Sequence, residues 1–199
     1  FDYFDLNEEY DLAPRLGLSY NIDERTSLNA AYGIFYQNLA PSLLVQHADN
    51  STLENPRADH FVLGFRRRMT PNTSLTIEGY VKTYTELPYD PNDPTASIID
   101  SYAEYGSPTP GRLIGGGEAR SWGTEIMLQK KLAHRLYGTA SYSYSVSEYT
   151  DLTGEVRNRG FDNRHLLSLI VGYRPSDHWE YSLRWSFAGG RPYTPFDAD

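Results

Sequence analysis

The chain alternates apolar and polar residues in stretches of roughly ten positions, and it does so eight times. Successive side chains of a β-strand point to opposite faces, so this alternation predicts strands with one apolar and one polar face. In residues 179–187, for example, Trp179, Leu183 and Phe187 alternate with polar residues such as Glu180 and Arg184. The predicted strands are residues 15–22, 28–37, 60–69, 74–84, 121–131, 135–146, 164–174 and 179–187.

Short and long connections between these strands follow one another in strict order. The first, third, fifth and seventh connections have roughly three to four residues, whereas segments 38–56, 85–118 and 147–161 are much longer. An up-and-down outer-membrane barrel has short periplasmic turns and long extracellular loops. The order therefore predicts an all-β fold, an antiparallel up-and-down transmembrane β-barrel whose three long loops face outward.

Composition excludes several other classes. The net charge is -8, whereas nucleic-acid binding needs clustered Lys and Arg. Cysteine is absent, which removes disulfides, thiolate catalysis and Cys-based zinc sites. No run approaches 18 apolar residues, and the start of the chain lacks the pattern of a signal peptide, so we expect neither a transmembrane helix nor a leader. The mean hydropathy of -0.58 resembles that of a soluble protein, but polar loops and a polar lumen would give the same average.

Charged residues in mid-strand indicate which face meets lipid. A charged side chain at the bilayer midplane of a barrel costs about 2 to 4 kcal/mol, so Glu78, Glu125 and Arg184 are expected to face the lumen. The full set of predicted lumen-facing residues is Glu78, Lys82, Glu125, Gln129, Glu180 and Arg184. Arg67 and Lys130 share the apolar face but lie beside short turns, where long side chains can reach the headgroups.

Four tyrosines in the predicted outer loops are candidate ligand-binding residues: Tyr89, Tyr102, Tyr105 and Tyr149. Amphipathic aromatic side chains in exposed loops bind ligands well. The alternative interpretation, packing of the loops within the barrel mouth, suits each single tyrosine as well or better.

No pattern of catalytic or metal-binding residues was found. The five histidines are scattered without the spacing of a metal site, and consecutive residues such as Asp162 to His165 point to opposite faces of a strand. Residues 90–93 gather oxygens that could hold Ca²⁺, yet a solvated turn is the favoured interpretation. We therefore expect no enzyme activity, no catalytic residue, no metal and no cofactor.

Several segments resemble the barrel of TonB-dependent receptors, in particular those of Bacteroidetes-like bacteria. They are residues 32–37 (YGIFYQ), 55–65 (NPRADHFVLGF), 117–131 (GEARSWGTEIMLQKK), 161–165 (FDNRH) and 189–195 (GGRPYTP). Their order and spacing are similar to the C-terminal half of that barrel.

The resemblance implies a 22-stranded barrel in the outer membrane of a Gram-negative bacterium, of which residues 1–199 would form about eight strands. It also implies uptake of a scarce solute such as a siderophore, glycan or peptide. Expected partners are outer-membrane lipid, a plug domain and the remaining strands, and an inner-membrane energy-coupling protein. The plug, a signal peptide and the terminal strand are not expected within these residues.

Two other folds remain open at this point. A complete eight-stranded barrel with an adhesive or structural role would require the first and last strands to pair. Glycines on the would-be interior face, including Gly17, Gly123 and Gly172, favour a wide wall over a tightly filled core. A soluble carbohydrate-binding β-sandwich would require the strands to divide between two sheets.

Overall fold

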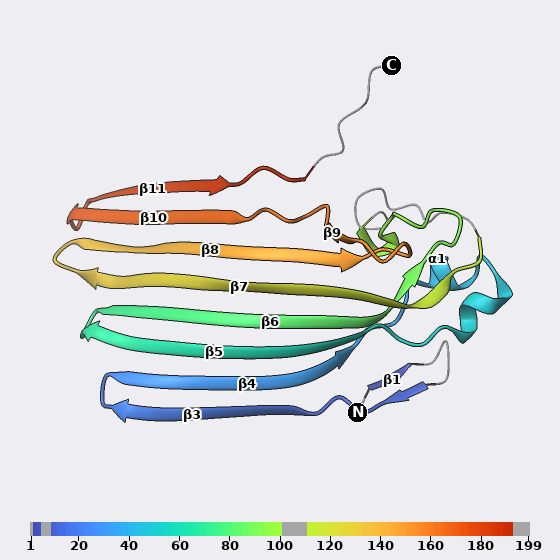
Figure 1. Cartoon of the computed structure of the whole chain (residues 1–199). Helices are drawn as coiled ribbons and strands as arrows, with labels where there is room; N and C mark the ends of the chain where they lie inside the picture. The colour runs from blue at the N-terminus through green and yellow to red at the C-terminus, as the bar shows by residue number, and fades with distance from the viewer. Residues whose placement is uncertain (1, 5–8, 101–110, 193–199) are drawn as a thin grey trace, which may run out of the picture.

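The computed structural model describes residues 2–4, 9–100 and 111–192, and eight long antiparallel strands dominate it (Figure 1). In chain order these strands are β3 (Arg15–Asp23), β4 (Thr26–Tyr36), β5 (Arg57–Thr70), β6 (Thr73–Tyr89), β7 (Ile114–Ala133), β8 (Leu136–Thr150), β10 (His165–Ser176) and β11 (Trp179–Ala188). All eight predicted strands are confirmed. Each pairs with its neighbour in sequence, except that the short strand β9 (Val156–Asn158) pairs with the outer end of β8.

The sheet is open at both sides. Its order is β11-β10-β8-β7-β6-β5-β4-β3, so β3 and β11 are the two edges and do not pair with each other. The alternative of a complete, closed eight-stranded barrel is therefore wrong for this structure. The sandwich alternative is also wrong, because the eight long strands form one sheet instead of two packed sheets.

The register aligns the predicted faces across the whole sheet. One row of cross-strand partners crosses all eight strands and consists of Tyr20, Leu28, Phe65, Ile77, Ile126, Tyr142, Leu167 and Phe187. The next row, on the opposite face, includes Asn29, Glu78, Glu125 and Ser143. We call these the apolar face and the polar face. The apolar face is uncovered, and Leu16 and Leu183 are 74% and 61% exposed.

Several strand boundaries differ from the prediction. The predicted loop 85–118 is shorter, because β6 continues to Tyr89 and β7 begins at Ile114. At the opposite end, Arg135 belongs to a two-residue turn with His134, and both residues have positive φ, 53° and 66°. Positive φ at both central positions is the geometry that joins twisted strands, although Asn-Gly is its usual sequence. His134-Arg135 is not a usual sequence for this turn, so the sequence did not predict a two-residue turn here.

Glycine occurs on the polar face for a different reason from the one that the sequence suggested. Gly123 and Gly172 lie beneath the rings of their cross-strand partners Tyr80 and Tyr137. A Cβ on Gly172 would overlap the ring of Tyr137. These glycines make room for tyrosine rings, so their presence does not by itself indicate a wide lumen.

The remaining described elements are short. They are the hairpin β1 (Asp2–Phe4) and β2 (Glu9–Asp11), the helix α1 (Pro41–Leu44) and the 3-10 turn η1 (Ala48–Thr52). None of the helices in the described part of the chain has the length and apolar character needed to cross a membrane. In the described part of the chain, a cluster of buried apolar residues lies among the long loops, at the end of the sheet opposite the short turns.

Candidate functional site

The three long connections gather at one end of the sheet, on the right in Figure 1. They are residues 37–56, 90–113 and 151–164, of which 101–110 lie outside the described residues. Leu43 from the first loop packs with Ile98 and Leu113 from the second, and each of the three is at most 3% exposed. Ala40 and Leu53 pack around them. The loops therefore have an apolar core of their own, which we call the loop core.

Asn50 joins the first loop to the second. Its side chain is 0% exposed, and its Nδ2 donates to the carbonyl oxygens of Leu43 and Gly111 at 2.8 and 3.1 Å. Its Oδ1 accepts a hydrogen bond from the backbone N–H of Leu113 at 2.8 Å. A buried amide with both ends satisfied holds neighbouring segments firmly, because any displacement leaves buried polar groups unpaired.

The second loop is joined to the third by an ion pair. The Arg159 guanidinium donates to Asp100 Oδ1 from Nε at 2.9 Å and from Nη2 at 2.5 Å. The backbone N–H of Gly160 donates to Oδ2 of the same carboxylate at 3.0 Å. Both side chains are largely shielded from solvent, with exposed fractions of 21% and 11%. Charge-assisted bonds of this kind are stronger than bonds between neutral groups.

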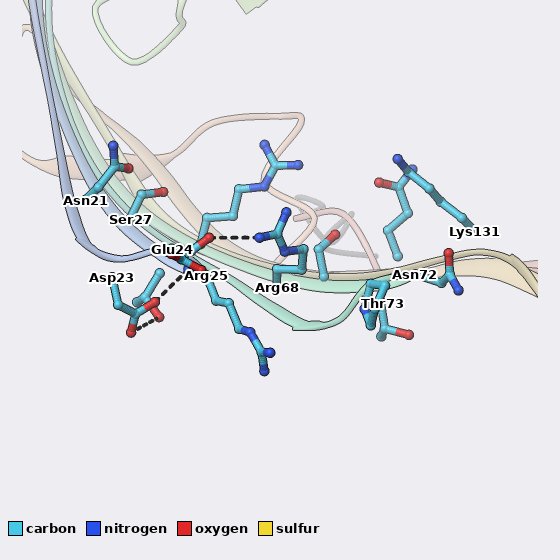
Figure 2. Close-up of a pocket in the computed structure, with 14 residues that line it drawn as sticks. Asn21, Asp23, Glu24, Arg25, Ser27, Arg68, Asn72, Thr73 and Lys131 are labelled. Carbon is cyan, nitrogen blue, oxygen red and sulfur yellow. Dashed lines mark hydrogen bonds between the residues drawn. The ribbon is translucent and has the colours of Figure 1, made fainter.

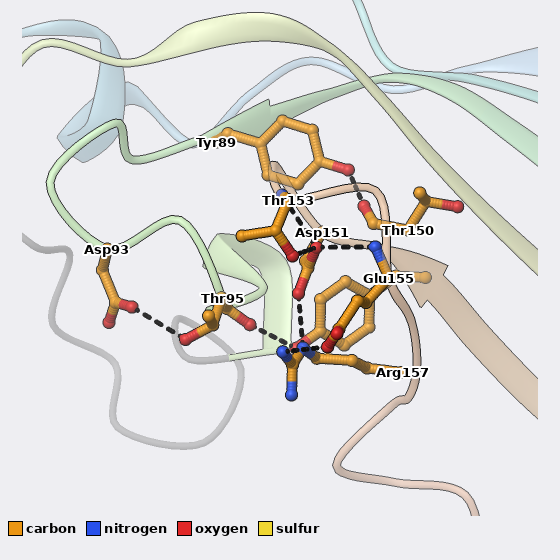
Figure 3. Close-up of polar contacts among 9 residues, drawn as sticks. Tyr89, Asp93, Thr95, Thr150, Asp151, Thr153, Glu155 and Arg157 are labelled. Atoms are coloured by element: carbon orange, nitrogen blue, oxygen red, sulfur yellow. Dashed lines mark hydrogen bonds and ion pairs between the residues drawn. The ribbon is translucent and has the colours of Figure 1, made fainter.

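Asp151 organises the third loop from within (Figure 3). Its carboxylate accepts hydrogen bonds from the backbone and hydroxyl of Thr153, from the backbone of Glu155 and from Nε of Arg157. The Thr153 hydroxyl, followed by the Arg157 guanidinium, holds the pKa of Asp151 far below its ordinary value. The adjoining Leu152 N–H donates to the carbonyl of Pro94 in the second loop at 2.9 Å.

An open cleft of about 500 Å³ lies between these loops and the outer ends of β4, β5 and β6. Three aromatic rings on the polar face line it: Phe35, His60 and Tyr84. The centroid of His60 lies 4.5 Å from that of Phe35 and 6.3 Å from that of Tyr84. Asn38 Oδ1, also at the cleft, is buried without a hydrogen-bond partner among the described residues. The cleft thus combines ring faces with an available acceptor, a combination suited to an amphipathic solute.

The predicted loop tyrosines lie elsewhere. Tyr89 ends β6, is 7% exposed, and its hydroxyl donates to the carbonyl of Thr150. The Tyr149 hydroxyl donates to the carbonyl of Thr95 at 2.7 Å. Tyr102 and Tyr105 lie outside the described residues. Ligand binding by any of the four stays a prediction. The two that are described join the end of β6 and the second loop to the outer end of β8.

The sequence prediction missed the aromatic cleft. Phe35, His60 and Tyr84 come from three strands, and only the register shows that they are neighbours. All three residues alternate with the apolar-face residues of their strands, which was the available sign that they share the polar face. It did not identify them, because an aromatic residue at a strand end fits equally well at the membrane interface.

The predicted lumen residues share the polar face. Glu78 and Glu125 are direct cross-strand partners, and Gln129 and Arg184 lie on the same face nearer the short turns. The Lys82 Nζ lies 5.1 Å from the ring centroid of Tyr80. Glu180 accepts a hydrogen bond from the Tyr137 hydroxyl and pairs with Arg174 at 3.2 Å. That this face lines a lumen remains a prediction.

The candidate calcium segment adopts a turn. Asp90 is 2% exposed, and its Oδ1 accepts hydrogen bonds from the backbone and the side chain of Asn92. Within residues 2–4, 9–100 and 111–192, no three His, Asp or Glu side chains gather to hold a metal ion.

One sheet with an exposed apolar face, short turns at one end and packed loops at the other is the wall of a membrane-spanning β-barrel. The family model of the "TonB dependent receptor-like, beta-barrel" matches residues 1–199. The chain therefore belongs to the TonB-dependent receptor β-barrel family, and it is an outer-membrane barrel segment of a Gram-negative bacterium.

Solved structures with the same fold are outer-membrane receptors. The ferripyoverdine receptor of Pseudomonas aeruginosa has a TM-score of 0.63 at 13% identity, over 88% of this chain and 25% of the receptor. The alcaligin receptor FauA of Bordetella pertussis has a TM-score of 0.61 at 16% identity, over 89% of this chain and 29% of the receptor. The ferric-catecholate import receptor Fiu of E. coli K12 has a TM-score of 0.61 at 15% identity, over 82% and 22%.

The chain thus spans less than a third of each of these receptors. No curated protein matches it.

Proposed function

We propose that this chain forms part of an outer-membrane receptor that captures a scarce solute at its outer loops and imports it with energy from the inner membrane. The aromatic cleft carries the proposal, because it lies on the polar face directly beneath the packed loops. Transport, not catalysis, is the activity that such a wall and mouth support.

The solute first contacts Phe35, His60 and Tyr84 in this proposal. The faces of these rings bind the planar or sugar-like parts of a solute, and the Asn38 amide oxygen accepts a hydrogen bond from it. Ferric siderophores are the first solute class to assay, because the similar structures above include receptors for ferripyoverdine and ferric catecholates. Glycans and peptides are the other classes.

The polar face lines the lumen in the assembled barrel and contacts a plug domain of the same polypeptide. Glu78 and Glu125 support this part of the proposal. Their like charges lie directly opposite each other, which is unfavourable unless a cation from another segment lies between them. Gln129 and Arg184 extend the contact toward the short turns.

Binding and uptake by cells that carry the full-length receptor test the proposal. Labelled ferric siderophores, oligosaccharides and peptides are offered in turn. For the bound solute, His60→Ala and Tyr84→Ala should each weaken binding by about tenfold, as expected when one ring contact is lost. His178→Ala, at a short turn, is the matched control and should leave binding unchanged.

A protonophore should abolish uptake while leaving binding intact. Uptake that persists in de-energised cells contradicts energy-coupled transport. Binding that is insensitive to both cleft variants contradicts the location of the site.

A further inference from the structure

Two cations on the apolar face take no part in the proposed function. Arg67 of β5 is the cross-strand partner of Leu75, which pairs in turn with Leu128, so it stands in a row of apolar side chains. Lys130 lies two residues beyond Leu128 on the same face of β7. No ion pair joins Arg67 or Lys130 to the described part of the chain. We call these two residues the membrane cations.

The turn between β3 and β4 supplies a carboxylate on the same side of the sheet. Figure 2 shows Asp23 and Arg25 on one side and Lys131 on the other. The Asp23 carboxylate accepts hydrogen bonds from the backbone N–H of Arg25 at 2.7 Å and from the Thr26 hydroxyl at 3.1 Å. It attracts the Arg67 guanidinium without forming an ion pair with it. Asp23 therefore offsets the charge of Arg67 only in part.

Positive charge is left over toward β7. Asp23 and Glu24 belong to the β3–β4 turn together with Arg25, whereas Lys130 lies four strands from β3, roughly 19 Å away. Interactions between exposed charges separated by more than about 10 Å are largely screened at ordinary ionic strength. The carboxylates of that turn thus leave Lys130 free to attract an anion.

A groove on the apolar face begins next to the membrane cations. It has a volume of about 500 Å³ and extends across β3 to β6. Ala30 and Gly79 form its floor, because they are the smallest residues in a row that also contains Leu63. Phe65, at its edge, lies two residues from Arg67 along β5, a separation of roughly 7 Å.

The groove and the membrane cations have the order of the parts of a phospholipid. The short turns of such a barrel face the periplasm, so Arg67 and Lys130 lie at the depth of the headgroups and the groove lies deeper in the hydrocarbon. Their Cα atoms stand two strands and roughly two residues apart, roughly 12 Å in all. Both long side chains can therefore reach one phosphate between them.

We propose that the apolar face binds one anionic glycerophospholipid of the periplasmic leaflet. Its phosphate lies between Arg67 and Lys130, and one of its acyl chains fills the groove over Gly79. Guanidinium groups bind phosphate through two parallel hydrogen bonds, and these bonds are strong where water is scarce. The site lies on the face opposite the aromatic cleft, so it is distinct from the solute site of the proposed function.

Charge favours an anionic lipid over two other occupants. The ammonium group of a zwitterionic headgroup would be repelled by the same cations that attract its phosphate. A second copy of this chain would use the same patch on both partners in a two-fold contact, which would bring two sets of membrane cations together. Neither occupant offers the net negative charge that the membrane cations require.

Native mass spectrometry of the full-length receptor in detergent tests the inference. The receptor is titrated with phosphatidylglycerol and, separately, with zwitterionic phosphatidylethanolamine, and bound lipids are counted from the mass. We expect one phosphatidylglycerol per receptor at concentrations where phosphatidylethanolamine does not bind. In Arg67→Gln/Lys130→Gln the affinity for phosphatidylglycerol should fall about tenfold or more, because two cations at the membrane surface are lost.

Arg66→Gln/Lys131→Gln is the matched control. It removes the adjacent cation from each of the same two strands, but on the polar face, and it should leave the affinity unchanged. Equal affinity for the two lipids overturns the inference. So does an unchanged affinity in Arg67→Gln/Lys130→Gln.

Gly79→Leu tests the groove separately. A Cβ at Gly79 would meet only the carbonyl oxygen of Gly123, at 3.9 Å, so the new side chain can enter the groove without disturbing the sheet. Lipid affinity should fall severalfold. Ala140→Leu, on the same face outside the groove, should have no effect. Equal affinities of these two variants overturn the assignment of the acyl chain to the groove.

A photoreactive phosphatidylglycerol with a diazirine on its acyl chain locates the lipid. The label should concentrate in β5 and β6 around Phe65 and Gly79. Label spread evenly over the wall, or a receptor dimer that carries no lipid, overturns the inference. Solute binding at the aromatic cleft is measured on the same variants and does not depend on the membrane cations, so either proposal can fail alone.

Discussion

Glu78 and Glu125 are direct cross-strand partners on β6 and β7, so two carboxylates of like charge share one position on the polar face. Directly opposed like charges destabilise a sheet by a few tenths to about 1 kcal/mol. Under the proposed function, a cation of the plug domain lies between them.

The first prediction concerns this pair. Under the proposed function, Glu78→Gln/Glu125→Gln in the full-length receptor should lower the urea concentration at which the plug domain becomes protease-sensitive, because a plug cation would lose its partners. Ser143→Ala, in the same row, should leave that concentration unchanged. An unchanged or raised midpoint in the double variant would show that nothing cationic contacts these carboxylates.

A second prediction concerns Gly172. In Gly172→Ala the new methyl group would overlap the Tyr137 ring, displace it and break its hydrogen bond to Glu180. Overpacking of this kind costs about 1 to 3 kcal/mol, which should appear as a lower urea midpoint of barrel unfolding. Gly17→Ala is the control, since nothing lies within 4 Å of its Cβ position, and it should be neutral or slightly stabilising. Equal effects of the two substitutions would refute the steric explanation.

Asn50→Ala should open the first two loops. The substitution leaves the Leu113 N–H and two carbonyl groups without their partner beside the loop core, at a cost of about 1 to 3 kcal/mol. Amide hydrogen exchange of residues 37–56 should accelerate accordingly. Asn72→Ala, in an exposed short turn, supplies the comparison. If exchange in this loop stayed at the wild-type rate, Asn50 would not be its anchor.

Asp151→Asn should loosen the third loop, because an amide cannot accept all the hydrogen bonds that the carboxylate receives and loses the charge that faces Arg157. Limited proteolysis should then cut within residues 151–164 faster than in the wild type. Glu155→Gln, which alters an exposed partner of the same arginine, should have a much smaller effect. Similar cleavage rates in both variants would contradict the central role of Asp151.

The same carboxylate sets a pH dependence. The pKa of Asp151 is lowered in the folded loop, so its stabilising effect is complete above the ordinary aspartate pKa of about 3.9 and is lost only as pH falls toward the lower folded value. Exchange protection of residues 151–158, corrected for intrinsic rates, should therefore remain constant from about pH 7 to about pH 5. A loss of protection within that range would place the sensitive group elsewhere.

The strands were predictable because side-chain alternation depends only on local sequence. That Tyr20 and Phe187 lie on the apolar face follows directly from it, whereas their place in one row depends on the register of the strands between them. The packing of the loops was not predictable, since Asn50 reaches Leu113 across 63 residues and Arg159 reaches Asp100 across 59. No local pattern marks such partners. The outward extension of β6 and β7 was missed because Pro88 and the glycines 115–117 resemble loop residues.

Asn50 and Asp100 make the three loops one inherited unit. The first loop supplies the amide that the second needs, and the second supplies the carboxylate that the third needs, so a loop transplanted alone from another receptor would arrive without its partners and leave buried polar groups unpaired. Recombination within the family is therefore expected to exchange residues 37–56, 90–113 and 151–164 together, with the strands between them free to diverge.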